Sequence, residues 1–193
     1  MSTPMNRFPP DRAPSAGDTA RPPGWRNLSR AYKDPLVRAG LVLGAGFAGL
    51  ADGIILHQIL GWHHLVCYTM DCQPTSVAEL VKENTQDGYF HLGLWLALML
   101  GTAMLFWAMR EADTNSDGSG RVLLGAILAG AGAFNFLEGL INHQILGLHH
   151  VLPGSPHQFL FDMLYLANGA LFFAVGAWLI RTARNAGLKR YCQ

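Results

Sequence analysis

Two stretches of the sequence repeat the same pattern of acids and histidines. Residues 52–64 read DGIILHQILGWHH, residues 138–150 read EGLINHQILGLHH, and nine of the thirteen positions are identical. Each copy contains a carboxylate, a histidine five residues later and a pair of adjacent histidines. Imidazole and carboxylate groups are ligands that zinc, copper and iron accept in proteins. The repeated pattern therefore predicts a metal site to which both copies contribute.

Two other segments add acids and histidines. Asp87 and His91 are four residues apart and share one face of a helix, so Asp87 either binds the metal beside His91 or orients its imidazole. Residues 157–165 read HQFLFDMLY and supply one more histidine, an aspartate and a tyrosine. The predicted metal ligands are His57, His63, His64, Asp87, His91, His143, His149 and His150. The three that lie within apolar segments, His57, His91 and His143, are favoured, and His157 is the weakest histidine.

Two kinds of cofactor fit this pattern. One is a copper, zinc or iron ion, and the alternative is haem b with His57 and His143 as axial ligands from two helices. The sequence has no C-x-x-C-H motif, so a haem would be held without covalent attachment. If the protein is an enzyme, Asp52 and Glu138 are the candidate proton carriers. In an α-helix each of these acids is about 140° from its histidine, so we expect both to face a neighbouring helix.

The chain that positions these residues is apolar. Half of its residues are hydrophobic and 14% are charged, against roughly 25% charged in an average soluble domain. Four segments reach the length of about 20 apolar residues that crosses a bilayer, namely residues 36–60, 89–109, 122–146 and 159–180. They lack the alternation of strands, and residues 94–107 show no polar face. We therefore predict an all-α membrane bundle and disfavour a soluble one.

The repeat predicts the topology of this bundle. Two helical hairpins related by a pseudo-twofold axis along the membrane normal would form residues 35–184, with a disordered tail at 1–34 and a second tail at 185–193. Basic residues before the first span and after the last place both termini in the cytoplasm. The histidines then lie in the outer leaflet. Gly61 and Gly147 are expected to end their helices and let the chain turn back toward His57 and His143.

The cysteines and the net charge bear on compartment and partners. Cys67 and Cys72 lie in the predicted outer loop, where a disulfide is favoured over free thiols or metal ligands. The net charge of +1 and the absence of a basic stripe argue against nucleic acid as a partner. The lipid bilayer is the expected environment, and a membrane-protein partner or a homo-oligomer stays open.

Three functions compete at this level. The leading hypothesis is a metal-binding membrane protein with a role in redox chemistry, oxygen chemistry or metal handling. The second is a proton or metal-ion transporter, which requires polar groups through the inner leaflet, where Thr102 and Asn168 are the main ones. The third is an assembly or scaffold protein in which the polar cluster is only a hydrogen-bonded core.

The phrases DGIILHQILGWHH, DGYFHLGLW and FNFLEGLINHQILGLHHV resemble a family of bacterial four-span membrane proteins known as domain of unknown function 2243. The resemblance covers about residues 34–184. It implies an integral membrane protein with four helices. Together with the positions of the basic residues, this leads us to expect a location in the bacterial inner membrane, with the histidines facing the periplasm. It implies no activity for any residue of this chain.

Overall fold

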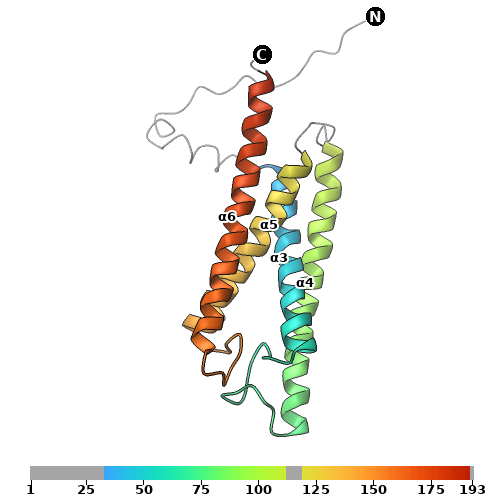
Figure 1. Ribbon diagram of the computed structural model, residues 1–193. Helices are drawn as coiled ribbons and strands as arrows, with labels where there is room; N and C mark the ends of the chain where they lie inside the picture. The colour runs from blue at the N-terminus through green and yellow to red at the C-terminus, as the bar shows by residue number, and fades with distance from the viewer. Residues whose placement is uncertain (1–32, 112–118, 192–193) are drawn as a thin grey trace, which may run out of the picture.

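The computed structural model describes residues 33–111 and 119–191 of the chain. In this part the chain forms α3 (Pro35–Asp52), η1 (Gly53–Ile59), α4 (Val77–Glu111), α5 (Ser119–Glu138), η2 (Gly139–Ile145) and α6 (Gln158–Tyr191) (Figure 1). Four segments are long and apolar enough to cross a membrane. The predicted all-α membrane bundle is therefore confirmed. The predicted tail at 1–34 lies almost wholly outside the described residues, and residue 185 falls within α6.

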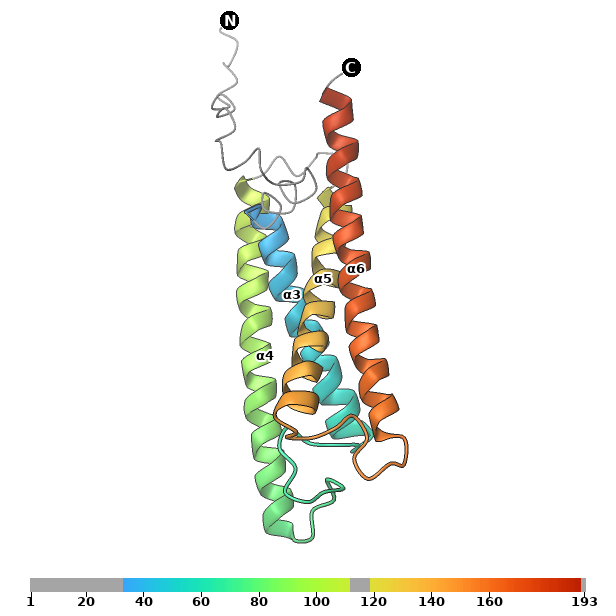
Figure 2. The ribbon, with the colours of Figure 1, turned by 90° about the vertical axis from the view of Figure 1, so that its left-hand side faces the viewer.

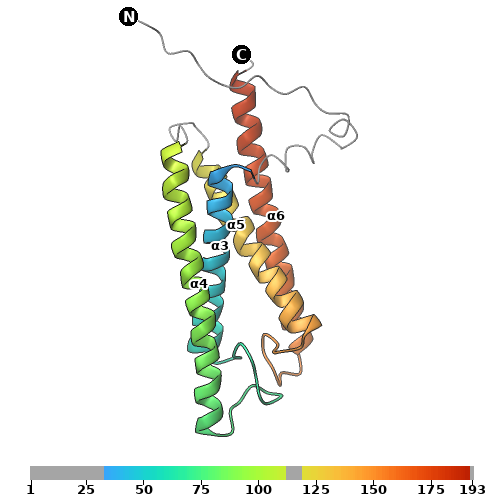
Figure 3. The same ribbon diagram turned by 180° about the vertical axis from the view of Figure 1, so that it is seen from behind.

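The four long helices lie side by side in the order α4, α3, α5, α6. Helices α3 and α5 pack against each other at the centre, α4 covers α3, and α6 covers α5 (Figure 2), and the view from behind shows the same order (Figure 3). The central pair approaches closely because a Cβ atom at Gly44 or Gly130 would collide with the backbone of the opposite helix. Large apolar side chains on the flanking helices, such as Trp95 and Phe173, point outward, as expected for surfaces that face lipid.

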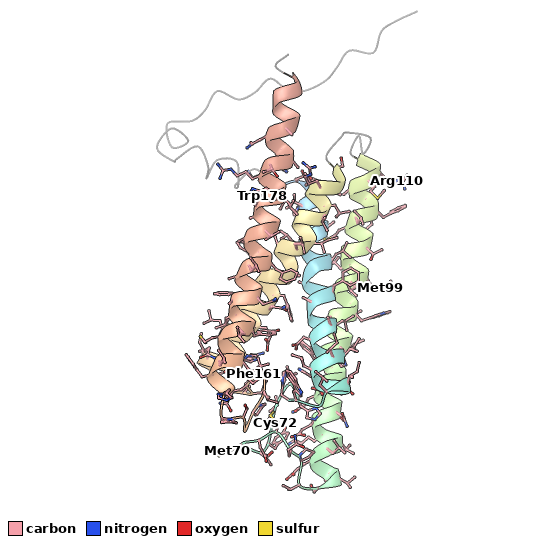
Figure 4. The ribbon with its side chains drawn as sticks, viewed as in Figure 1. Met70, Cys72, Met99, Arg110, Phe161 and Trp178 are labelled. Carbon is pink, nitrogen blue, oxygen red and sulfur yellow. A yellow bond between two sulfur atoms is a disulfide. The ribbon has the colours of Figure 1, made fainter. Side chains whose placement is uncertain are left out.

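The two ends of the bundle differ in character. Arg110 and Trp178 lie at the end where α3 begins and α6 ends, whereas Cys72 lies at the opposite end (Figure 4). We call this opposite end, formed by η1, η2 and the loops 60–76 and 146–157, the loop end. A disulfide joins Cys67 and Cys72 there, as predicted.

Helix α4 begins earlier than predicted. The sequence predicts a span from residue 89, with an outer loop before it, but the helix begins at Val77. Its first turn is capped, because the Ser76 hydroxyl accepts from the Glu79 amide at 3.2 Å and the Glu79 carboxylate accepts from the Thr75 amide at 2.8 Å. The added turns place Asp87 inside a helix rather than at its start.

Both copies of the repeated pattern change from α-helix to π-helix just after their acid. These π-helical segments are η1 and η2, with backbone bonds such as the one from the Leu60 amide to the Ile55 carbonyl at 2.9 Å. Each is followed by a glycine with positive φ, 56° at Gly61 and 58° at Gly147. The predicted glycine turns are thus confirmed, while the π-helices were not foreseen. Short π-helical segments are rare and occur often at functional sites.

Candidate metal centre

Two compact groups of acids and histidines lie at the loop end. We call Asp52, His57 and His63 the first set, and Glu138, His143 and His149 the second set. In each set one ligand atom from each side chain lies within 4.8 Å of the others, and every member except the half-buried Glu138 is buried. Figure 4 shows nitrogen-bearing side chains gathered between the helices at the level of Phe161.

The first set depends on the π-helix and the glycine turn. Oδ2 of Asp52 lies 3.4 Å from Nε2 of His57, and the rings of His57 and His63 have their centroids 4.6 Å apart. The expectation that Asp52 turns away from His57 is therefore wrong. A π-helical turn holds more residues than an α-helical turn, so residues five apart come onto one face. The turn at Gly61 then brings His63 back beside His57.

The second set has the same construction with a longer acid. Oε1 of Glu138 lies 3.4 Å from Nε2 of His143 and 3.3 Å from Nε2 of His149. The centroids of the two histidine rings are 4.8 Å apart. The expectation that Glu138 faces away from His143 fails for the same reason as for Asp52. Both acids, which the sequence predicts as proton carriers, lie among the candidate metal ligands.

Backbone contacts show that Nδ1 carries a proton in two of these histidines. Nδ1 of His63 is 2.9 Å from the carbonyl oxygen of Val151, and Nδ1 of His149 is 2.9 Å from that of Leu65. A carbonyl oxygen only accepts, so each Nδ1 carries a proton and donates. Burial, together with His149 and His57 nearby, lowers the pKa of His63 to about 2, so this ring is neutral.

Two aspartates hold the surrounding side chains in matching ways. The Asp87 carboxylate accepts hydrogen bonds from the backbone amide of Leu65 at 2.8 Å and from the side-chain amide of Gln58 at 3.1 Å. Its oxygens also lie 3.0 Å from Nδ1 of His57 and 2.7 Å from Nδ1 of His64. Asp162 makes the corresponding contacts with Val151, Gln144, His143 and His150, at 3.0, 3.1, 3.6 and 2.6 Å. Asp87 thus contacts His57 and His64, whereas the sequence pattern had paired it with His91, and it does not belong to either set. Carboxylates commonly hold metal-binding imidazoles this way.

The remaining predicted ligands lie outside the two sets. His64 directs its Nδ1 to Asp87, and His150 directs its Nδ1 to Asp162. In each pair of adjacent histidines, this is the member that points away from the set. His91 is nearby, since its ring centroid is 6.4 Å from that of His57 and its buried Nε2 has no hydrogen-bond partner. His157 is exposed. The structure therefore gathers His57, His63, His143 and His149 and leaves the other four histidines around them.

The two sets interleave. The rings of His63 and His149 stack with centroids 4.6 Å apart and an interplanar angle of 11°. His57 is 6.2 Å from His149, and His63 is 6.1 Å from His143, again between ring centroids. The buried Nε2 atoms of all four rings lack a hydrogen-bond partner. Four imidazoles from two parts of the chain thus form one cluster.

A tyrosine and a cavity adjoin this cluster. The Tyr165 hydroxyl lies 3.4 Å from Oδ1 of Asp52 and interacts with Glu138, so it touches both sets. A cavity of about 370 Å³ opens among the loops and is lined by His149, His150 and the disulfide loop that contains Met70. The second set therefore borders a space that reaches the surface.

Several contacts of the site were not predicted. The sequence analysis did not foresee the roles of Gln58 and Gln144 or the carbonyl acceptors on Leu65 and Val151. The glutamines had a visible signal, since the dipeptide HQ occurs in both copies. The carbonyl contacts depend on how the two loops cross, which no local pattern reports.

Comparison with known proteins identifies a family but no activity. Residues 39–183 match the family model described as predicted membrane protein (DUF2243). No curated protein and no solved structure matches the chain.

Proposed function

The chain belongs to the DUF2243 family of predicted membrane proteins, and we propose that it is a multi-pass membrane protein that binds two transition-metal ions, one in each set. Each set supplies two imidazoles and one carboxylate. This donor combination suits divalent zinc, copper and iron.

The buried Nε2 atoms of His63 and His149 are the observation that carries this proposal. Both nitrogens lack a hydrogen-bond partner, and their Nδ1 protons are committed to carbonyl groups. Nε2 of His149 lies 3.3 Å from a carboxylate oxygen of Glu138, and Nε2 of the neutral His63 is a buried acceptor without a partner among the described residues. Unsatisfied buried acceptors are costly. A bound cation satisfies the imidazole and the carboxylate together.

The geometry favours metal ions over haem. A haem bound between His57 and His143 would need the space between them. His63 occupies that space, with its ring centroid 4.6 Å from that of His57 and 6.1 Å from that of His143. Separate ions need no such space, because the imidazoles already converge.

The rest of the bundle favours binding over transport. Between the two ends, the described central helices pack glycine against backbone, as at Gly44 and Gly130. Thr102 and Asn168, the polar residues considered for a pathway, are exposed on the outer faces of α4 and α6. A transporter needs polar groups that line a path through the interior.

We also propose that the loop end faces the periplasm and that both termini lie in the cytoplasm. The Cys67–Cys72 disulfide at the loop end suits an oxidising compartment. Arg38, Arg110 and Arg181 lie at or near the other ends of their spans, as the positive-inside rule requires for a cytoplasmic side.

Metal content measured by mass spectrometry tests the central proposal. The full chain, purified in mild detergent, is expected to hold two equivalents of copper, zinc or iron. His57→Ala and His143→Ala should each lose at least one equivalent, and the double variant should lose both. His157→Ala removes an exposed histidine outside the sets and is the matched control, expected to keep both.

A folded wild-type protein that binds no metal after incubation with each ion would contradict the proposal. A double variant with unchanged metal content would contradict it equally. Helical circular dichroism and gel filtration of every variant separate loss of ligands from loss of fold. If no metal binds, the scaffold hypothesis, in which protons alone link the histidines, takes its place.

A further inference from the structure

The two sets are linked by hydrogen bonds, because a histidine of each set donates to the backbone of the loop that carries the other set. His63 in the first set donates to the carbonyl of Val151, the residue after the second histidine pair. His149 in the second set donates to the carbonyl of Leu65, the residue after the first pair. Each loop therefore orients a ligand of the other set. The rings of His63 and His149 stack with centroids 4.6 Å apart, so the two sets adjoin each other there.

Each set has too few donors to complete a metal's coordination. Three protein ligands leave at least one position open on a four-coordinate ion. A site with two imidazoles and one carboxylate is typical of metals that bind an exogenous ligand. Two such ions side by side can hold one ligand between them, as two-metal sites do.

Tyr165 lies beside the carboxylates of both sets. Its hydroxyl lies 3.4 Å from Oδ1 of Asp52 and interacts with Glu138, and its ring is 5.3 Å from that of His143. The corresponding position beside His57, three residues after Asp87, is Phe90, which has no hydroxyl. The cluster thus has a phenol on one side only.

The cavity limits the size of the ligands that can reach the two sets. It is lined by His149 and His150 and has a volume of about 370 Å³. The inner wall is closed more tightly, since His149 is 3% exposed and His63 behind it is 1% exposed. Because these inner side chains are almost fully buried, the centre favours small ligands over larger organic molecules.

We propose that the two sets form one dinuclear centre that binds a single small oxygen- or nitrogen-donor ligand between its two metal ions, with Tyr165 redirecting to that ligand the hydrogen bond that it donates to Asp52. This proposal rests on the proposed function, because it requires both ions. The ligand reaches the centre through the cavity beside His149.

Azide binding to the copper-loaded full chain tests this proposal. We expect one azide per two Cu(II) ions in a titration followed by the charge-transfer absorption band. We also expect the electron paramagnetic resonance signal of the two ions to be strongly reduced by coupling. Tyr165→Phe should weaken azide binding by about ten-fold or more, because a hydrogen bond to a charged ligand is lost. Tyr89→Phe, which alters an exposed tyrosine on α4, is the matched control and should bind azide normally.

Narrowing the cavity supplies a kinetic readout. Leu148 lines the cavity, so Leu148→Trp should slow azide association and leave the metal content unchanged. An unchanged association rate would show that the ligand arrives by another route and would overturn that part of the proposal.

The outcomes distinguish this inference from the proposed function. Two bound coppers with one azide each and an uncoupled spectrum would overturn the dinuclear centre while leaving metal binding intact. Unchanged azide affinity in Tyr165→Phe would overturn the role of the phenol. If the folded protein, incubated in turn with copper, zinc and iron, bound none of them, the proposed function would be overturned and this inference with it.

Discussion

The first and second sets are built on matching scaffolds but differ in how tightly their surroundings hold them. In both, a π-helix follows the acid, a glycine turns the chain, and an aspartate from the next long helix contacts a histidine. The contact is 3.0 Å between His57 and Asp87 but 3.6 Å between His143 and Asp162. The side chain of His64 is 11% exposed, whereas that of His150 is 32% exposed and borders the cavity.

The repeated pattern therefore determines which side chains converge. Residues outside the pattern determine how firmly those side chains are held and how accessible they are to solvent and ligands. Glu83 is fully buried beside His64 in the first half, with its Oε2 3.8 Å from Nε2 of His64. The second half has a cavity lined by His150 and Gln158. We therefore expect the first set to hold its ion more tightly and the second set to exchange its ion more readily.

The largest expected effect comes from removing the aspartates' charge. Loss of such an orienting carboxylate typically lowers metal affinity by about 10-fold to 100-fold. Asp87→Asn should lie at the upper end of that range for the first set, because Asp87 contacts His57 directly. Asp162→Asn should lie at the lower end for the second set.

Competition titration against a chromophoric chelator measures this difference. Each aspartate is changed in a protein in which only the set beside it can bind metal. Asp87→Asn is therefore combined with His143→Ala, which disables the second set, and Asp162→Asn is combined with His57→Ala, which disables the first set. Equal losses, or a larger loss for Asp162→Asn, would break the comparison between the sets.

The next effect concerns the rate at which metal leaves. Adding excess chelator to the metal-loaded protein should remove the ions in two phases of one equivalent each. The faster phase should belong to the second set, because that set borders the cavity. It should disappear in His143→Ala and persist in His57→Ala. A fast phase that survives His143→Ala would show that the more exposed surroundings of the second set do not control exchange.

A smaller effect tests whether the two scaffolds are equivalent. Alanine at Gly61 or Gly147 would have to adopt a positive φ, which costs about 1–2 kcal/mol. No atom lies near enough to clash with an added Cβ at either position, so the loss of folding free energy should be backbone strain alone and similar in both. Gly93→Ala in α4, also without neighbours but with an ordinary helical φ, is the control and should not destabilise the protein. Thermal unfolding in detergent measures all three, and clearly unequal losses would contradict the shared scaffold.

The smallest effect concerns a contact that only the second set has. The Asn142 side chain donates to Oε1 of Glu138 at 3.2 Å, whereas Leu56 is the corresponding residue in the first half. Asn142→Leu should therefore weaken the binding of the metal ion in the second set by about 1 kcal/mol or less, which is a change of a few-fold in its dissociation constant. Metal titration in the His57→Ala background detects it. No change would mean that Glu138 is positioned by the histidines alone.

The sequence predicted the parts of this structure that depend on local pattern. Four apolar segments predicted four helices, because no other structure satisfies the backbone of such long apolar runs in a membrane. Gly61 and Gly147 predicted the turns, since glycine adopts positive φ without strain. The early start of α4 was missed, although Ser76 and Glu79 form the S-x-x-E pattern of a capping box.

The arrangement of the site depended on features that local pattern does not carry. Nothing in the sequence reports that residues 53–59 wind as a π-helix, so the positions of Asp52 and Glu138 relative to their histidines were wrongly predicted. The exchange of hydrogen bonds between His63 and Val151, and between His149 and Leu65, depends on two loops meeting in space. These contacts select one histidine of each pair, which the sequence left open.

Metal binding by the converging histidines is the central claim, and anomalous X-ray diffraction from crystals of the protein tests it most directly. Data collected on both sides of the absorption edge of the bound metal should show two peaks at the loop end. One peak should lie among the ligand atoms of Asp52, His57 and His63, and the other among those of Glu138, His143 and His149. A metal-incubated crystal with no anomalous peak among these six side chains, in which ordered waters satisfy the four Nε2 atoms, would contradict the account.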